Sequence, residues 1–420
     1  MLKQIYRLVL STLRHVLSGT VADETVKPDA EQWKAFFHVC CSHSILALAA
    51  DALPPERIAQ WTAPPAERLL AAYADRARAE ILSQANRTGE LCLLYRYLRS
   101  KGLHPLVMKG IVCRALYPDP EHRPSTDEDL LVKPAEFQQL HQALLNYGFV
   151  LSDPGKDAAT QFEVAYQDKD KRLYIEVHKT PFTPDSPYLD RLNDCFLGAH
   201  DRAVTQQICG TEFLTLGPED HMLYLLLHAL KHFLYSGFGI RQICDIGLYA
   251  EAYRTEIDWD SLRARLENIG AMDFARAVFR IAEEQLLPES RAAKYLADWD
   301  LTGVDPEPLL ADVMEGGIYG SATMSRLHSS NMTLRAASMQ SGHGPSAVLY
   351  SLFPPLTAMQ GKFPYLEKLP ALLPVAWLQR LGGYLWELIR HRGRANSALM
   401  SIRLGSERIR LLEQYNIIKN

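Results

Sequence analysis

The sequence lacks the features that would place it among membrane-spanning, secreted or disordered proteins. No stretch approaches the roughly 18 consecutive apolar residues of a spanning helix. The seven cysteines are odd in number and scattered, and none belongs to a Cys-x-x-Cys pair, which favours buried thiols in a reducing compartment. Only 22% of the residues are charged and 47% are hydrophobic, a balance that excludes disorder as the main state. We therefore expect a soluble, folded, cytoplasmic protein.

The chain also lacks a strong excess of charge and any internal repeat. Its formal net charge is -4 and its pI is about 6.4, so there is no global electrostatic attraction to nucleic acid. Nucleic acid is therefore not an expected partner unless a local basic groove forms. No repeat is evident at periods of 20 to 50 residues. A length of 420 residues is enough for two or three packed units.

The stretch from Leu106 to Lys133 carries the most informative pattern in the chain. It begins with a short apolar run that stops at Lys109-Gly110, and apolar residues at helical spacing follow directly. This order predicts a strand, a tight turn and a helix. A lysine and a glycine at such a turn offer a positive charge and free backbone N–H groups, which suit a phosphate.

Two aspartates of an Asp-x-Asp motif come next. After a Pro-rich loop, Asp127 and Asp129 precede the apolar run 130–132, which is typical of a strand buried between layers. In an extended backbone the two aspartates face one side and Glu128 faces the other. Two carboxylates on one face repel each other unless a cation or a basic partner lies between them. One explanation is a divalent metal such as Mg2+, and the other is a pair of solvated acids at a strand end.

A third carboxylate is available downstream. Residues 161–167 and 172–178 have the pattern of two strands joined by a polar turn, which predicts a hairpin. In the second strand Glu176 and His178 share the face opposite to the apolar residues. An unpaired acid in such a strand would be costly, so Glu176 needs a partner.

The order of these motifs resembles that of a known family. The chain is similar to the uncharacterised nucleotidyltransferase family, often called the NTP-transferase-5 type, of the DNA polymerase beta-like superfamily. The similarity lies in the Lys-Gly turn and helix, Arg123-Pro124, the Asp-x-Asp motif and the strand with Glu-Val-His. It implies an α+β fold, with a small mixed-sheet nucleotidyltransferase core flanked by N-terminal and C-terminal helical regions. It also implies a catalytic metal triad of Asp127, Asp129 and Glu176 that binds Mg2+ or Mn2+.

The resemblance further implies which residues contact the nucleotide. Lys109 and the backbone of Gly110 would hold phosphate oxygens, although most of the superfamily has Gly-Ser at this turn. Glu128 departs from the family pattern as well, because an aliphatic residue is usual there. The full set of expected nucleotide-binding residues is Lys109, Gly110, Arg123, His178, His228, Lys231, His232 and Arg241.

The histidines of a later helix allow more than one interpretation. His228 and His232 lie four residues apart and so share one helix face. A zinc-protease motif would need Glu beside the first histidine, and that residue is absent. The pair could be hydrogen-bonded in a helix interface near Asp245, or hold a metal. Alternatively, with Lys231 and Arg241, the histidines could line the nucleotide cleft.

Helical patterns account for most of the remaining chain. We expect an N-terminal helical region over residues 1–101, an α+β core over 102–200 and a C-terminal helical region over 201–420. Within the first region, residues 31–53 and 66–100 each have the apolar spacing of one helix.

Two amphipathic segments raise the question of a membrane contact. One is the N-terminal helix, and the other is the strongly apolar segment 372–389, whose aromatic residues are flanked by arginines. Helices of this kind usually pack on their own domain, and a peripheral contact with a membrane surface is the alternative.

These observations predict a metal-dependent nucleotidyltransferase that moves a nucleoside monophosphate from an NTP to an unidentified acceptor. The acceptor would be a sugar, a lipid-linked sugar or a protein. Families of this kind often accompany genes for cell-surface polysaccharides, which suggests a link to polysaccharide synthesis.

Two other classes of protein stay open. A glycosyltransferase also uses Asp-x-Asp, but it normally places several βα units before the motif, and here a long helical region comes first. A non-catalytic nucleotide-binding protein that retains the fold is the other alternative. The released product distinguishes the three classes: pyrophosphate indicates a nucleotidyltransferase, UDP indicates a glycosyltransferase, and no product indicates a binding protein.

Overall fold

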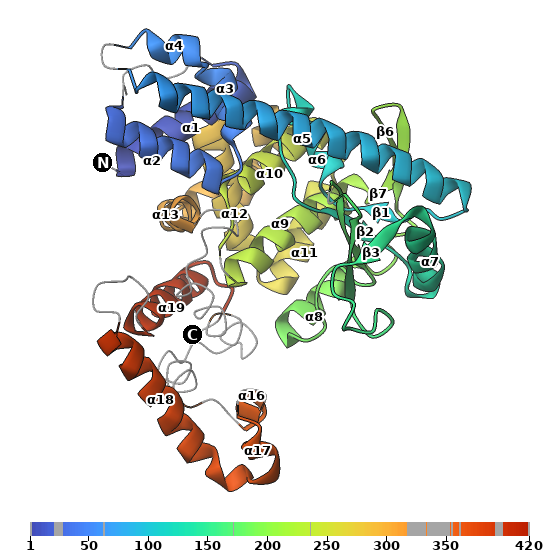
Figure 1. Cartoon of the computed structure of the whole chain (residues 1–420). Helices are drawn as coiled ribbons and strands as arrows, with labels where there is room; N and C mark the ends of the chain where they lie inside the picture. Colours follow the sequence, from blue (N-terminus) through green and yellow to red (C-terminus); the bar gives the residue numbers. More distant parts are fainter. Residues whose placement is uncertain are drawn as a thin grey trace.

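The computed structural model describes residues 2–20, 28–61, 64–170, 172–235, 237–316, 333, 353, 356–360, 363–390 and 398–418. In these residues a seven-stranded mixed sheet lies at one side of a mainly helical body (Figure 1). The long helix α5 (Glu67–Ser100) runs from the N-terminal helices to the sheet. The expected α+β fold, a mixed sheet with helical regions before and after it, is confirmed.

The sheet has the strand order β3-β4-β5-β2-β1-β7-β6. Its central strand β2 is parallel to β5, and β1 is parallel to β7, while the other neighbours are antiparallel. This arrangement places the predicted hairpin directly beside the Asp-x-Asp strand. The strands are β1 (Leu106–Val107), β2 (Glu128–Leu131), β3 (Phe149–Leu151), β4 (Glu163–Asp168), β5 (Tyr174–His178), β6 (Val204–Ile208) and β7 (Thr211–Thr215).

Three strands of this sheet, β3, β6 and β7, are not among the expected elements. β7 pairs with β1 through Val107 and Thr215, so the sheet extends past the expected end of the core at residue 200. Strands β6 and β7 are short, alternate in exposure and pair with each other, and they join the sheet because β7 also pairs with β1, far earlier in the chain. The sequence around them carries no local signal of that partner.

The N-terminal helices form a layer that supports α5. The apolar face of α1, which includes Ile5, Leu8 and Leu13, is buried against the protein itself. The helix expected over residues 31–53 is two helices, because Ser44 adopts a left-handed backbone with φ 51° and interrupts the helical hydrogen bonds. The helices are α1 (Leu2–Ser18), α2 (Ala30–Ser42), α3 (Leu46–Ala52) and α4 (Pro55–Ala59).

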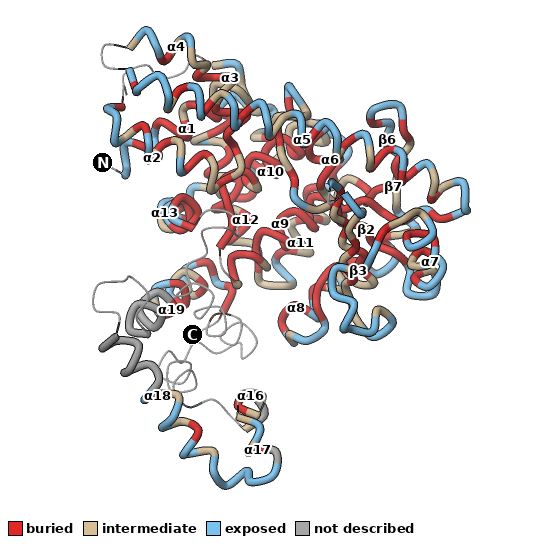
Figure 2. Tube along the Cα trace, in the orientation of Figure 1, coloured by how far each residue is buried: buried red, intermediate tan, exposed pale blue. Residues whose placement is uncertain are grey.

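Helix α9 lies at the centre of the helical body and is buried along most of its length (Figure 2). It is apolar on nearly all sides, which is the pattern of a helix surrounded by other elements. Helix α10 packs beside it. The helices from the sheet to this body are α6 (Ile111–Arg114), α7 (Phe137–Tyr147), α8 (Pro187–Asn193), α9 (Pro218–Tyr235), α10 (Ile240–Tyr253), α11 (Trp259–Ile269), α12 (Met272–Ile281) and α13 (Glu307–Gly316).

The last helices extend away from the body (Figure 1). Helices α16 (Leu356–Gln360), α17 (Tyr365–Lys368) and α18 (Leu373–Arg390) share a small apolar cluster of their own. Helix α19 (Ala398–Gln414) returns to the body, where Leu412 is buried. Within the described residues, no helix is both long and apolar enough to span a bilayer.

Glu128 ties the central strand to the helix that follows the Lys-Gly turn. The residue is 2% exposed, and its carboxylate forms an ion pair with Arg114, with 2.9 Å between Oε1 and Nη2. Its Oε2 accepts a hydrogen bond from the backbone N–H of Ile111 at 2.9 Å. Gly110 has φ 58°, and a Cβ there would lie 1.8 Å from Glu128 Oε2, so glycine is required at this turn. The acid that replaces the expected aliphatic residue is therefore fully paired.

Glu128→Ala should lower the free energy of unfolding by about 3–5 kcal/mol, because it leaves the buried Arg114 charge without its carboxylate. Urea denaturation monitored by circular dichroism measures this. Asp75→Ala is the control, since its ion pair with Arg78 is exposed on both sides and should change stability by about 0.5 kcal/mol or less. A loss in Glu128→Ala as small as that in the control would show that the pair does not stabilise the core.

Candidate functional site

Acidic side chains gather on one face of the central strands. Asp129 of β2 and Glu176 of β5 lie directly opposite each other in the parallel register. His178 Nε2 is 3.0 Å from Asp129 Oδ1 and 3.9 Å from Glu176 Oε2. One ligand atom from each of these three residues lies within 4.8 Å of the other two. Asp127 joins the group through a shared partner, Lys109.

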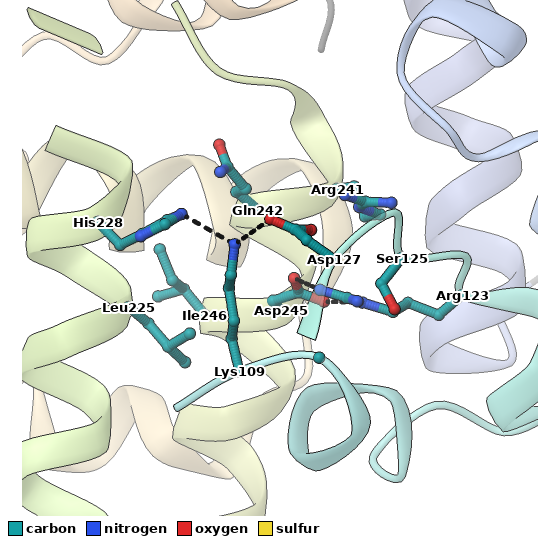
Figure 3. A pocket seen from close by; sticks show the side chains of 11 residues that line it. Lys109, Arg123, Ser125, Asp127, Leu225, His228, Arg241, Gln242, Asp245 and Ile246 are labelled. Carbon is teal, nitrogen blue, oxygen red and sulfur yellow. Dashed lines mark hydrogen bonds and ion pairs between the residues drawn. The ribbon is translucent and has the colours of Figure 1, made fainter. Parts of the chain in front are cut away.

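Lys109 Nζ lies between the two aspartates of the motif. It is 3.1 Å from Asp127 Oδ2 and 2.8 Å from Asp129 Oδ2. On its other side it lies 3.4 Å from His228 Nε2 (Figure 3). Burial by itself would raise the pKa of Asp127. The charge of Lys109, its hydrogen bond to Asp127 and the charge of Arg241 act in the opposite direction and hold that pKa well below its usual range. The lysine thus supplies the cation that two neighbouring carboxylates require.

The donor set fits a divalent cation. The 2.8 Å contact between Lys109 and Asp129 is an ion pair without hydrogen-bond geometry, so the buried Asp129 Oδ2 accepts no hydrogen bond from the described part of the chain. Burial and the charges of Asp127 and Glu163 raise the pKa of Glu176. A cation bound among these oxygens would relieve that repulsion, and carboxylate oxygens are the ligands that Mg2+ and Mn2+ prefer.

Glu163 of β4 is a fourth acid that the sequence analysis misses. It is the register partner of His178, and its Oε2 lies 3.6 Å from His178 Nδ1. The imidazole therefore lies between Glu163 and Asp129, and burial lowers its pKa to about 4. The signal was present in the predicted hairpin, because pairing around the polar turn 168–171 already places Glu163 on the face of Glu176.

A pocket lined by arginines lies beside Asp127 (Figure 3). Arg123 forms two hydrogen bonds to Asp245, of 3.1 Å from Nε and 2.5 Å from Nη2. Arg241 donates from Nη1 to the carbonyl of Pro124. Arg123 Nη1 and Arg241 Nε are buried, and neither has a hydrogen-bond partner among the residues that the structure describes. Buried guanidinium N–H groups of this kind suit a phosphate or carboxylate.

The two arginines are close enough to affect each other. Burial, and next the charge of Arg123, lowers the pKa of Arg241 to about 10. Arg241 therefore keeps its positive charge at neutral pH, but the two like charges favour the entry of an anion. The pocket residues are Lys109, Gly110, Arg123, Ser125, Asp127, Leu225, His228, Arg241, Gln242, Asp245 and Ile246.

Helix α9 contributes the histidine pair. His232 Nε2 and His228 Nε2 are 2.7 Å apart, and His228 Nδ1 is 3.2 Å from the Tyr224 hydroxyl. Burial lowers the pKa of both histidines well below the usual value. The two rings are thus hydrogen-bonded to each other, while His228 also lines the pocket. Asp245 is bound to Arg123 instead of to the histidines.

Lys231 lies among the charges of the acidic face. Burial lowers its pKa, and the carboxylates of Glu163, Glu176 and Asp127 act in the opposite direction. Of the expected nucleotide-binding residues, Lys109, Gly110, Arg123, His228 and Arg241 line the pocket. His178 lies among the acids instead. His232 does not line the pocket, and its Nε2 contacts His228, which does.

The sequence predicts free backbone N–H groups at the Lys109-Gly110 turn, but the first two N–H groups of α6 already have partners within the protein. The Ile111 N–H donates to Glu128, and the Val112 N–H donates to the carbonyl of Lys109. The reason is Glu128, whose side chain lies on the opposite face of β2 from Asp129. Its carboxylate accepts the hydrogen bond at the N-terminus of α6, which is the positive end of the helix dipole. Lys109 is left as the positive group of this turn.

The chain is similar to a family model and to a solved structure. The family model described as "Uncharacterised nucleotidyltransferase" matches residues 29–286, a range that contains the entire sheet and the pocket. A solved structure titled as an antigenic nucleotidyltransferase-like protein from Paracoccidioides brasiliensis matches 59% of this chain and 97% of its own, with 16% identity and a TM-score of 0.30. The curated proteins contain no match.

The depressed pKa of Asp127 predicts a pH-dependent contribution to stability. An unfolded aspartate titrates near pH 3.9, whereas the folded Asp127 titrates well below that. The ion pair with Lys109 therefore contributes fully above about pH 5, and its contribution is lost as the pH falls further.

Asp127→Asn should be less stable than the wild type at pH 7, and the difference should shrink between about pH 5 and pH 2. Urea unfolding at a series of pH values measures this. Asp75→Asn, at an exposed position, should follow the wild-type curve throughout. A difference that stays constant with pH would contradict the assigned ion pair.

Proposed function

Because the chain belongs to the uncharacterised nucleotidyltransferase family, we propose that it is a metal-dependent enzyme that transfers a nucleoside monophosphate from an NTP to an acceptor. The observation that carries this proposal is the convergence of Asp129 and Glu176 from adjacent parallel strands beside an arginine-lined pocket. Such a site pairs acidic ligands for a cation with basic donors for a triphosphate.

Asp127, Asp129 and Glu176 would hold a divalent ion, Mg2+ or Mn2+. Bound there, the ion would offset the charge of the triphosphate and favour attack of the acceptor oxygen at the α-phosphorus. The buried Asp129 Oδ2 and the raised pKa of Glu176 support this assignment.

The pocket would hold the phosphates of the nucleotide. Asp245 fixes the guanidinium of Arg123 through two hydrogen bonds, which leaves Nη1 for a phosphate oxygen (Figure 3). Arg241 would add its Nε, and Lys109 its ammonium group. In this proposal the Gly110 backbone, His178, His228, Lys231 and His232 complete the nucleotide-binding set.

The acceptor would present a hydroxyl group on a sugar, a lipid-linked sugar or a protein. The sugar acceptors connect the proposal to cell-surface polysaccharide synthesis. One observation favours nucleotidyl transfer over glycosyl transfer: in the described chain, β1 is the single strand before the Asp-x-Asp motif, and no series of βα units precedes it. We also propose a cytoplasmic location, because all seven cysteines are free thiols.

Incubation with each α-labelled NTP and Mg2+ or Mn2+ should move label to an acceptor with release of pyrophosphate. Asp129→Asn should lower the rate by about a hundredfold or more, which is about 3 kcal/mol of transition-state stabilisation. Asp170→Asn is the control, because Asp170 lies in an exposed hairpin turn.

Other outcomes of the same assay support the alternatives. Release of UDP from a UDP-sugar would indicate a glycosyltransferase. Nucleotide binding without pyrophosphate release, over a range of acceptors, would indicate a binding protein that retains the fold.

The proposal includes a peripheral membrane contact through the start of α18 and the residue that precedes it. Leu372, Val375 and Leu378 are 38%, 42% and 69% exposed. An exposed apolar stripe of this kind suits the headgroup region of a bilayer. The protein should float with anionic phospholipid vesicles, and the double substitution Val375→Asp, Leu378→Asp should abolish flotation. Leu197→Asp, at another exposed leucine, is the control, and equal flotation of all three proteins would refute the contact.

A further inference from the structure

We propose that Lys109 is an internal cation that occupies the metal site until a metal–nucleotide complex displaces it. The inference rests on the proposed function and adds the form in which the substrate enters: the metal and the triphosphate arrive together. Because Lys109 would hold Asp127 and Asp129 until both ligands arrive, metal binding and nucleotide binding would be coupled.

The geometry of Lys109 is that of a bound cation. Its ammonium group lies 3.1 Å from Asp127 Oδ2 and 2.8 Å from Asp129 Oδ2, and His228 Nε2 lies 3.4 Å away. The side chain of Asp129 is 1% exposed, so its charge has little water to replace the lysine. Two oxygens and one nitrogen, from the residue before β2, from β2 itself and from α9, thus converge on one positive group.

A divalent ion and this ammonium group compete for the same oxygens. Mg2+ binds carboxylate oxygens at about 2.0–2.1 Å, so an ion held by both Oδ2 atoms would lie very close to Nζ. Like charges at such a distance repel strongly in a poorly solvated site. Lys109 must therefore leave the aspartates when the metal binds.

Displacement is costly unless Lys109 finds another anion. Separating a buried ion pair leaves an uncompensated charge, and a hydrated Mg2+ also gives up its waters reluctantly. A triphosphate removes the first cost, because its oxygens can accept the lysine. Lys109 lines the same pocket as Arg123 and Arg241, whose buried N–H groups suit phosphate, so the lysine has a short distance to move.

The expected consequence is reciprocal coupling. Nucleotide should raise the affinity for metal, and metal should raise the affinity for nucleotide by the same factor. Removing the lysine charge should uncouple the two, because the aspartates are then open to a metal ion without nucleotide.

The experiment is a titration of the full chain with Mn2+, with free Mn2+ measured by electron paramagnetic resonance. It is run without nucleotide and with a non-hydrolysable α,β-methylene NTP. The wild type should bind Mn2+ weakly alone and about tenfold or more tightly with the analogue. Lys109→Met should bind Mn2+ about tenfold or more tightly than the wild type without nucleotide, and the analogue should add little.

Control variants separate the inference from the proposed function. Lys133→Met, at an exposed lysine after β2, should behave as the wild type. Asp129→Asn should lose Mn2+ binding under both conditions. If Lys109→Met does not fold, Lys109→Gln removes the same charge and answers the same question.

Two results would overturn the inference, and the second of them would also refute the proposed metal-dependent function. Equal Mn2+ affinity of wild type and Lys109→Met without nucleotide would refute the internal cation and leave the metal site intact. Absence of Mn2+ binding in every variant, with and without the analogue, would refute both the inference and the metal-dependent function.

Discussion

The burial of two acids side by side in the central strand is the constraint on which the site depends. Glu128 and Asp129 are consecutive residues of β2, and both are almost completely buried. Because their side chains point to opposite faces, each face of the sheet must supply its own positive partners. Arg114 and the N-terminus of α6 serve Glu128, while Lys109 is the positive partner of Asp129 and the imidazole of His178 adds a polar contact. The turn at Lys109-Gly110 and the helix that follows it therefore supply positive partners to both faces of the strand.

This arrangement connects the sheet to the helical body as well. On the Asp129 face, Lys109 also contacts His228 of the buried helix α9, and Arg123 pairs with Asp245 of α10. Tyr117 donates a hydrogen bond to the same carboxylate at 2.8 Å, so α10 is held by two residues from the segment between β1 and β2. The pocket lies where these contacts meet. Its charged side chains are therefore held in position by the strands and helices that carry them. If the pocket binds an anion as we propose, the site would need little rearrangement apart from the movement of Lys109.

The order of motifs along the chain was sufficient to predict the family and the α+β class, and both are confirmed. Asp127 and Asp129 could be placed on one side of a buried strand because alternation is a local property of extended backbone. The hairpin that carries Glu176 and His178 was likewise visible as two apolar strands around a polar turn. The same hairpin held the signal for Glu163, because its predicted strand pairing places Glu163 on the face of Glu176.

The sequence by itself thus determined the features that depend on neighbouring residues. These are the periodicity of the strands and helices, the turn at Gly110 and the acids on one face of the strand. Tertiary structure alone decided which groups neutralise those acids. Lys109 is near Asp129 because β1 and β2 are antiparallel neighbours, and Glu128 reaches the N-terminus of α6 across the same pairing. The pairing of β1 with β7 is equally invisible in the sequence, because it joins residues that are distant along the chain. Charge compensation acts through space, and its partners emerge only when the fold brings those distant segments together.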